Sequence, residues 1–162
     1  VEYLVCANTP IDTLDELKKS IETLNKTGEA CKKAGINFCY HNHDMEFKEV
    51  EGQMPYHMML SQTGADTVKM ELDLCWVTKA GVDAVDLFKQ HPGRFPLWHV
   101  KDLDKEKQGP LPVGEGIVDF KKIFANAKTA GMKHFFVEHD MPKDAFASIT
   151  SSYNYLTKTL GV

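Results

Sequence analysis

The sequence predicts an α/β fold built on a parallel sheet, and three observations support this prediction. A short apolar strand, a polar loop and an amphipathic helix follow one another five times along the 162 residues. Strands that alternate with helices in this way form right-handed crossovers, which leave the strands parallel. The composition, with 43% hydrophobic and 26% charged residues, is typical of a globular protein with a hydrophobic core.

The predicted strands are short apolar runs bounded by polar or turn residues. We expect them at Glu2–Ala7, Asn37–His41, Val68–Leu72, Leu97–Val100 and His134–Val137. The first helix falls within Ile11–Lys33, where Thr13 and Glu16 have the spacing of a capping box and Gly35 is a typical helix stop. Further helices are expected near Pro55–Thr63, Ala84–His91, Asp119–Ala130 and Ser151–Thr159. Because no linker interrupts this series, we expect residues 1–162 to form a single domain.

Two architectures accommodate such units, an open doubly wound sheet and part of a (β/α)8 barrel. The open sheet calls for a glycine-rich phosphate loop after the first strand, but the sequence contains neither GxGxxG nor GxxxxGK[ST]. Polar residues instead gather at the C-terminal ends of the strands, which is where a TIM barrel places its chemistry. A complete barrel takes about 250 residues. We therefore expect the chain to be units four to eight of a (β/α)8 TIM barrel.

Side chains able to bind a metal end four of the predicted strands. Because residues two apart on a strand share a face, the pairs are His41 with His43, Glu71 with Asp73, His99 with Lys101, and Glu138 with Asp140. In a closed barrel these faces meet at one mouth, where converging charges are costly unless they are paired or hold a metal. Two imidazoles and two carboxylates suit Mn²⁺, Zn²⁺ or Co²⁺, with Mg²⁺ as an alternative. The predicted ligands are His41, Asp73, His99 and Glu138.

Five segments carry a resemblance to a known family. They are Tyr40–Phe47, Glu71–Asp73, Trp98–Asp102, Gly114–Phe120 and Phe136–Asp140. In these segments the chain resembles the xylose-isomerase-like TIM barrel superfamily of sugar phosphate isomerases and epimerases. The resemblance implies Glu, Asp, His and Glu as metal ligands, and Asp73, His99 and Glu138 match that pattern. His41 stands where the family has a glutamate, which leaves His43 and Glu46 as alternatives for that ligand.

The resemblance implies a sugar isomerase or epimerase that transfers a proton next to a carbonyl through a metal-stabilised enediolate. Glu138 and Glu46 are the expected acid and base groups, and Lys101 is expected to stabilise the developing oxyanion. Trp76, just beyond the third strand, is expected to stack on the sugar. His43 and Lys101 are further candidates for contact with the substrate.

Three other functions remain open. The same chemistry can expel a leaving group, which would make the protein a dehydratase or lyase of a keto-inositol or 3-keto-glycoside, with His43 as general acid. A DNA-repair endonuclease shares the barrel but needs a basic surface, which the net charge of −4 and the pI near 6.0 oppose. The last alternative is an inactive fragment. The expected partner is thus a small-molecule sugar, not nucleic acid, and a homo-oligomer is left open.

Cysteine usage and hydropathy bear on the compartment. The four cysteines show no CxxC spacing, so we expect free thiols and a reducing environment. No apolar run reaches the roughly 20 residues that span a bilayer, which predicts no membrane association. We expect a cytoplasmic protein and leave the periplasm open, because an N-terminal address would precede Val1. The charged run Asp104–Lys107 is expected to be a solvated loop.

Overall fold

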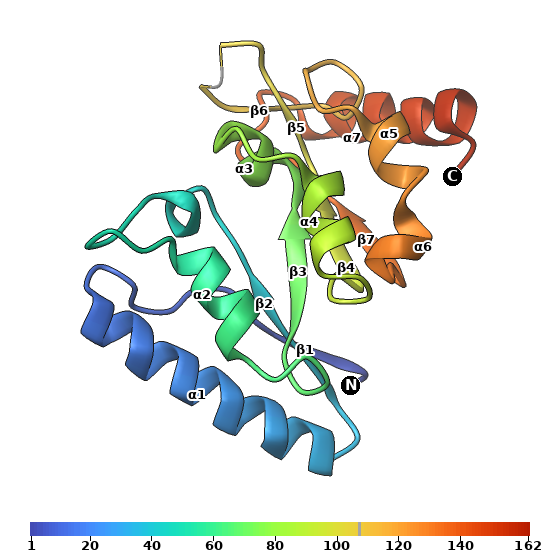
Figure 1. Ribbon diagram of the computed structural model, residues 1–162. Coiled ribbons are helices and arrows are strands. Elements are labelled where there is room, and N and C mark those ends of the chain that lie inside the picture. The colour runs from blue at the N-terminus through green and yellow to red at the C-terminus, as the bar shows by residue number, and fades with distance from the viewer. Residues whose placement is uncertain (107) are drawn as a thin grey trace.

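A sheet of five parallel strands forms the centre of the computed structural model, which describes residues 1–106 and 108–162 (Figure 1). The strands are β1 (Tyr3–Cys6), β2 (Asn37–His41), β3 (Lys69–Asp73), β4 (Leu97–Val100) and β7 (His134–Val137). Their order in the sheet is also their order in the chain. Strands that follow one another without a reversal build a barrel wall, whereas a doubly wound sheet reverses direction at a switch point. The fold is therefore a half-barrel of the TIM type.

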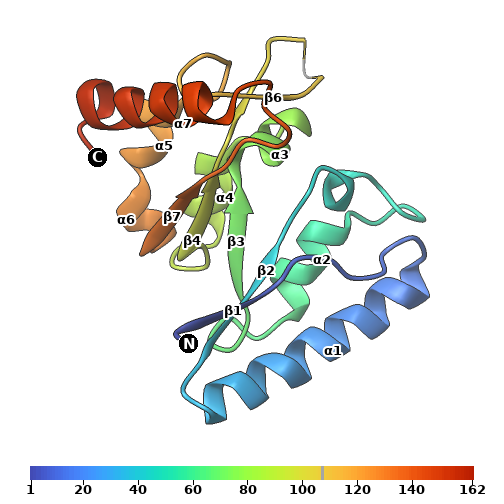
Figure 2. The same ribbon diagram turned by 180° about the vertical axis from the view of Figure 1, so that it is seen from behind.

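Helices cover one face of this sheet. The helices are α1 (Leu14–Lys33), α2 (Pro55–Gln62), α3 (Leu74–Lys79), α4 (Ala84–Gln90), α5 (Phe120–Phe124), α6 (Ala127–Ala130) and α7 (Ala145–Asn154), with a 3-10 turn at Met45–Phe47 and a π-helical end at Tyr155–Leu160. Helices α2 and α4 lie in front of the strands in Figure 1 and behind them in Figure 2, so both helices cover the same face of the sheet. None of the described helices is long and apolar enough to cross a membrane.

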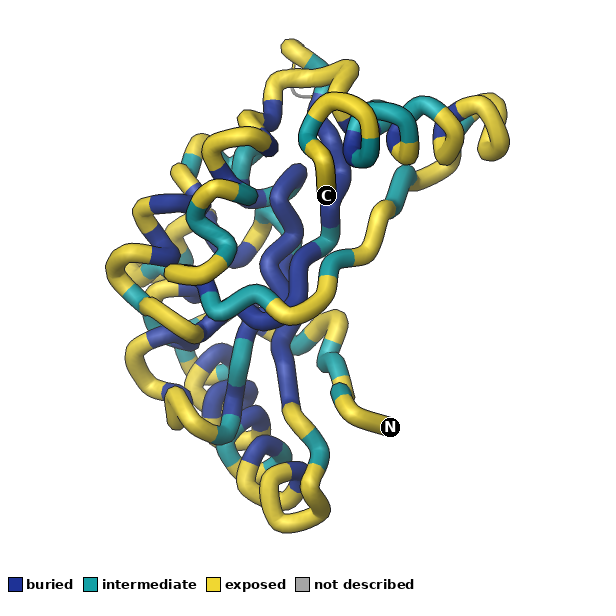
Figure 3. Tube along the Cα trace, turned by 90° about the vertical axis from the view of Figure 1, so that its right-hand side faces the viewer, coloured by how far each residue is buried: buried dark blue, intermediate teal, exposed yellow. Residues whose placement is uncertain are grey.

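The first helix has the predicted start. The Thr13 side chain accepts a hydrogen bond from the Glu16 backbone N–H, and the Glu16 carboxylate accepts one from the Thr13 N–H, which completes the capping box. Leu17, Ile21 and Leu24 are buried, as their helical spacing predicts. Figure 3 shows that the central strands are buried and that the helices alternate between buried and exposed residues, whereas the edge strands β1 and β7 are more exposed.

Three helices differ from the sequence prediction. The predicted helix Asp119–Ala130 is two short helices, and the break lies where the Asn126 side chain donates to the Lys122 carbonyl and competes with the helical ladder. Helix α7 begins well before Ser151, because Asp144 caps it by accepting from the Ala147 N–H. Helix α3 was not predicted, since its N-cap, Asp73, is also the last residue of a strand.

The apolar core lies between the sheet and its helices. The Trp98 indole stacks on the Phe88 ring with 5.2 Å between ring centroids and 1° between planes. Tyr56 and Leu72 are also fully buried there. The four cysteines are free thiols, as predicted. This packed side holds the strands in place, so that their polar ends are presented on a rigid base.

The segment after β4 is organised around one buried carboxylate. Asp102 begins the short strand β5 (Asp102–Leu103), which pairs antiparallel with β6 (Pro110–Leu111). The Asp102 carboxylate accepts hydrogen bonds from four backbone N–H groups, those of Leu103, Gly114, Gly116 and Val118. The loop beyond β6 is thereby tied to the end of β4.

The charged run after β5 is exposed in part. Lys105 and Glu106 are exposed, as expected for a solvated loop, whereas Lys107 lies outside the described residues. The Asp104 carboxylate accepts from the backbone N–H groups of Glu106, Gln108 and Gly109, so this side chain shapes the turn.

Candidate metal centre

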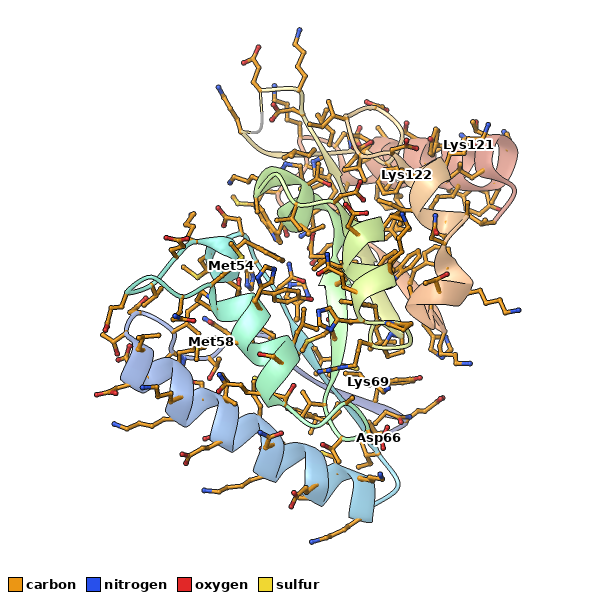
Figure 4. All side chains as sticks on the ribbon, viewed as in Figure 1. Met54, Met58, Asp66, Lys69, Lys121 and Lys122 are labelled. Carbon is orange, nitrogen blue, oxygen red and sulfur yellow. The ribbon has the colours of Figure 1, made fainter. Side chains whose placement is uncertain are left out.

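A cavity of about 370 Å³ lies at the carboxyl ends of the strands. β3 runs from Lys69, labelled at the lower end of the sheet in Figure 4, to Asp73 beside this cavity. The walls of the cavity are formed by Val5, Ala7, His41, His43, Glu71, Trp76, His99, Lys101, Glu138 and Asp140. Most of the residues that the sequence singled out for chemistry are therefore brought together in one place.

Three of the predicted metal ligands form one cluster. His41 ends β2, Asp73 ends β3, and His99 lies opposite Asp73 in the register between β3 and β4. One ligand atom from each of these side chains lies within 4.8 Å of the others. The strand ends can supply these groups together because every second residue of a strand points to the same face of the sheet.

Two buried atoms of this cluster lack ordinary partners. His41 Nδ1 and Asp73 Oδ2 are both buried and make no hydrogen bond of good geometry within the described residues. A Glu71 carboxylate oxygen lies 3.3 Å from His41 Nδ1, and Lys101 Nζ lies 3.3 Å from Asp73 Oδ2, so both contacts are electrostatic. Buried polar atoms without hydrogen bonds are costly. A divalent cation beside Asp73 Oδ2 would satisfy that oxygen, and two imidazoles with a carboxylate are ligands that such an ion takes, so the residues present fit it.

Glu138, the fourth predicted ligand, lies next to this cluster. Its Oε2 is 2.8 Å from His99 Nδ1 and 2.8 Å from Lys101 Nζ. Burial opposes the charge on Glu138, but hydrogen bonds and charge from Lys101, together with His99, outweigh burial and lower the pKa of this carboxyl. Glu138 is thus a carboxylate at neutral pH, and its side chain is 41% exposed to the cavity.

Lys101 is the cation at the centre of the site. Its side chain is only 3% exposed, and Nζ lies 2.8 Å from Asp140 Oδ2 in addition to its contacts with Asp73 and Glu138. Burial would lower the pKa of Lys101, but the Asp73 carboxylate and the hydrogen bonds to Asp140 and Glu138 raise it. The ammonium group is therefore retained at neutral pH.

Asp73 is held from two sides. Its Oδ1 accepts hydrogen bonds from the backbone N–H groups of Cys75 and Trp76, and its own N–H donates to the Asn42 side chain. Burial raises the pKa of Asp73, with opposing contributions from Lys101 and the two imidazoles. The capping bonds fix the carboxylate so that Oδ2 points toward the cluster.

The alternatives to His41 occupy different positions. The His43 ring is 5.0 Å from the His41 ring and 6.4 Å from Trp76, at the wall of the cavity. Glu46 is buried, and its two oxygens accept hydrogen bonds from the Tyr40 hydroxyl and the His43 backbone N–H. Of the three candidates on this segment, His41 is the one that clusters with Asp73 and His99.

Two acidic residues in the cavity wall received no role from the sequence. Glu71 and Asp140 each lie two residues from a predicted ligand and on the same face of the strand end. That spacing was the signal that could have identified them. Trp76 also lines the cavity, with Lys79 Nζ 4.8 Å and Lys101 Nζ 5.4 Å from its ring centroid.

Comparisons with known proteins agree with this architecture. The inosose dehydratase of Geobacillus thermodenitrificans is 24% identical over 174 residues, covering 94% of this chain and 58% of that protein. The crystal structure of a sugar phosphate isomerase/epimerase from Parabacteroides distasonis has a TM-score of 0.87 and 31% identity, and the match covers 99% of this chain and 59% of that one. The structure of IolI with a bound zinc atom has a TM-score of 0.72 and 18% identity, covering 97% and 62%. The chain spans less than two thirds of the length of each of these relatives.

A family model extends over nearly the whole chain. It is described as a xylose isomerase-like TIM barrel and matches residues 3–158. This match agrees with the half-barrel of parallel strands and with the resemblance seen in the sequence. The chain belongs to the xylose isomerase-like TIM barrel family.

Proposed function

We propose that the protein is a metal-dependent dehydratase or lyase that acts on a keto-inositol or a 3-keto-glycoside. The observation that carries this proposal is the cluster of His41, Asp73 and His99 at the wall of one cavity, beside a buried ammonium group and several carboxyl groups. The name shared by the curated relatives, inosose dehydratase, favours loss of water over isomerisation. We further propose that the chain supplies units four to eight of the barrel.

A divalent ion would be held by His41, Asp73, His99 and Glu138. When bound, Mn²⁺, Zn²⁺ or Co²⁺ would supply a Lewis acid for the carbonyl oxygen of the substrate. The excess of acidic side chains supports this assignment, because the three carboxyl groups of Asp73, Glu138 and Asp140 surround the single ammonium group of Lys101, and Glu71 faces the two imidazoles.

Side chains of the cavity supply the groups for proton transfer, charge stabilisation and contact with the substrate. Glu138 is ionised and partly exposed, so it can accept the proton next to the carbonyl. The Lys101 ammonium offsets the negative charge that then develops on the oxygen. His43, whose side chain is 39% exposed, can donate a proton to the leaving hydroxyl group. Glu46 acts through His43, whose backbone it holds, and Trp76 offers a wall on which an apolar face of the ring can stack.

An isomerase or epimerase is the second candidate function. The 31% identity with the structure from Parabacteroides distasonis favours it. Both reactions share the removal of a proton next to a carbonyl. They differ in the next step, since the carbon is reprotonated in an isomerase or epimerase, whereas in a dehydratase a neighbouring C–O bond breaks and water leaves.

The experiment that separates the two uses the purified protein with Mn²⁺, a keto-inositol, a 3-keto-glycoside and a ketose panel in D₂O. A dehydratase or lyase should form an unsaturated ketone that absorbs in the ultraviolet, with loss of water or of the aglycone. Solvent deuterium in a sugar that keeps all its oxygens would instead establish the isomerase or epimerase. Asp73→Asn is the matched control, and equal turnover by this variant would refute the site.

A further inference from the structure

Glu71 is a buried acidic residue of the cavity to which the proposed reaction gives no role. It lies in β3, two residues before Asp73, and is 5% exposed. Its Oε2 lies 3.3 Å from His41 Nδ1 and 3.4 Å from His99 Nε2. One carboxylate oxygen therefore faces a ring nitrogen of both predicted histidine ligands.

The two nitrogens of His99 have different neighbours. Nδ1 is 2.8 Å from Glu138 Oε2 and 3.8 Å from Asp73 Oδ2, whereas Nε2 faces Glu71. Nδ1 is thus the His99 nitrogen that faces Asp73 and Glu138, so an ion held by these two carboxylates would take Nδ1, which leaves Nε2 on the opposite side of the ring.

We infer that Glu71 is a positioning residue that orients both histidine ligands from behind. In the metal-loaded protein Glu71 would accept the Nε2–H of His99 and the Nδ1–H of His41, whose nitrogens lie 3.4 and 3.3 Å from its Oε2, so that His99 presents Nδ1 and His41 presents Nε2 to the ion. A neutral imidazole donates from one nitrogen and binds a metal through the other, and a carboxylate on the donor side selects the tautomer and orients the ring. One side chain thus determines the orientation of ligands from two different strands.

The arrangement also separates the carboxylates by task. Asp73 and Glu138 approach His99 on its Nδ1 side and are placed to bind the ion directly. Glu71 approaches both rings on the other side, and direct binding through Glu71 would draw the ion away from Asp73 and Glu138. This inference rests on the metal site of the proposed function, but not on the substrate or on the fate of the leaving group.

The first test measures the affinity for Zn²⁺ and Co²⁺ by calorimetry. We expect Glu71→Ala to weaken binding by about 10- to 100-fold, which is typical of a residue that orients a ligand. Glu71→Gln should lose less, because its amide oxygen still accepts one N–H. Glu22→Gln, on the exposed face of α1, removes the same charge and should bind as the unmodified protein does. Circular dichroism of each variant establishes that it is folded.

The affinities can overturn the inference in two ways. Unchanged affinity in folded Glu71→Ala would show that Glu71 does not orient the ligands. A complete loss in Glu71→Gln, equal to the loss in Asp73→Ala, would make Glu71 a ligand itself. Failure of the unmodified protein to bind either ion would refute the proposed function as a whole, whereas the first two outcomes leave the proposed function standing.

The second test reads the imidazole tautomers by long-range ¹H–¹⁵N correlation spectra of the zinc-loaded protein. We expect His99 to carry its proton on Nε2 and His41 to carry its proton on Nδ1, which are opposite tautomers. The visible spectrum of the Co²⁺ form should keep its band positions in Glu71→Gln, because the ligands stay the same. A proton on Nδ1 of His99 would overturn the inference, since Glu71 would then face the metal-binding nitrogen.

Discussion

Replacement of Asp102 by alanine should destabilise the protein more than any exposed aspartate replacement. The Asp102 carboxylate is fully buried, and four backbone N–H groups donate to it. The donors of Leu103 and Val118 are 2.8 and 3.0 Å from Oδ1, and those of Gly114 and Gly116 are both 2.9 Å from Oδ2. Alanine leaves all four donors without this acceptor.

The magnitude follows from the burial of the donors. Leu103 and Val118 are buried, so each of their N–H groups loses about 1–3 kcal/mol when its partner is removed. Gly114 and Gly116 are exposed, and water can replace the carboxylate at their N–H groups. We therefore expect Asp102→Ala to lower the free energy of unfolding by about 4 kcal/mol. Asp102→Asn should lose roughly half as much, because one amide oxygen still accepts two bonds.

Urea unfolding followed by tryptophan fluorescence and circular dichroism measures this loss. Trp98 in the core reports on the packed side of the sheet. Asp66→Ala, at an exposed aspartate on the far end of the sheet, is the matched control and should stay within about 0.5 kcal/mol of the unmodified protein. A loss below about 1 kcal/mol in Asp102→Ala would refute the argument that this carboxylate organises the loop.

Three further predictions concern the thiols, the first helix and the metal. Burial raises the pKa of the Cys39 and Cys75 thiols to about 12. A thiol reagent at pH 8 should therefore label Cys6 first, and it should label Cys39 and Cys75 only after unfolding. Rapid labelling of Cys39 or Cys75 in the native protein would contradict their burial. Alanine is a better helix former than glycine by about 1 kcal/mol, yet Gly28→Ala should destabilise the protein, because the added Cβ would lie 2.6 Å from the backbone carbonyl oxygen of Thr67. The control Lys26→Ala, at an exposed position of the same helix, should not destabilise it. A raised melting temperature in Gly28→Ala would refute this packing. Chelation should abolish turnover and lower the melting temperature, with recovery on addition of Mn²⁺, and a chelated protein of unchanged activity and stability would exclude the metal site.

Most of the secondary structure was predictable because its signals are local. Asn37–His41, Leu97–Val100 and His134–Val137 are strands with the predicted bounds, since runs of apolar residues between polar ends are sufficient to define a strand. The third strand lies one residue later than predicted, at Lys69–Asp73, because Asp73 still pairs with His99 in the ladder. The residue at which a strand ends depends on its register with the neighbouring strand, and this register cannot be read from the sequence of the strand alone.

The candidate site was predictable in part for the same reason. The period of two along a strand groups His41, Asp73 and His99, and one ligand atom from each lies within 4.8 Å of the others. It assigned no role to Glu71, and it did not indicate that Glu46 accepts hydrogen bonds from Tyr40 and from the backbone of His43. Such contacts depend on the loop conformation after β2 and on the separation of strands across the sheet, neither of which follows from spacing.

The amino-acid sequence by itself determined the alternation of strands and helices, the family, and the chemical types gathered at the strand ends, because these follow from local patterning. Only the tertiary structure decided which atoms meet: that His99 turns Nδ1 toward Glu138 and Nε2 toward Glu71, and that Lys101 lies among three carboxylates. The physical reason is that the register and twist of neighbouring strands bring together side chains that lie far apart in the chain, and the balance of charge among them arises only there.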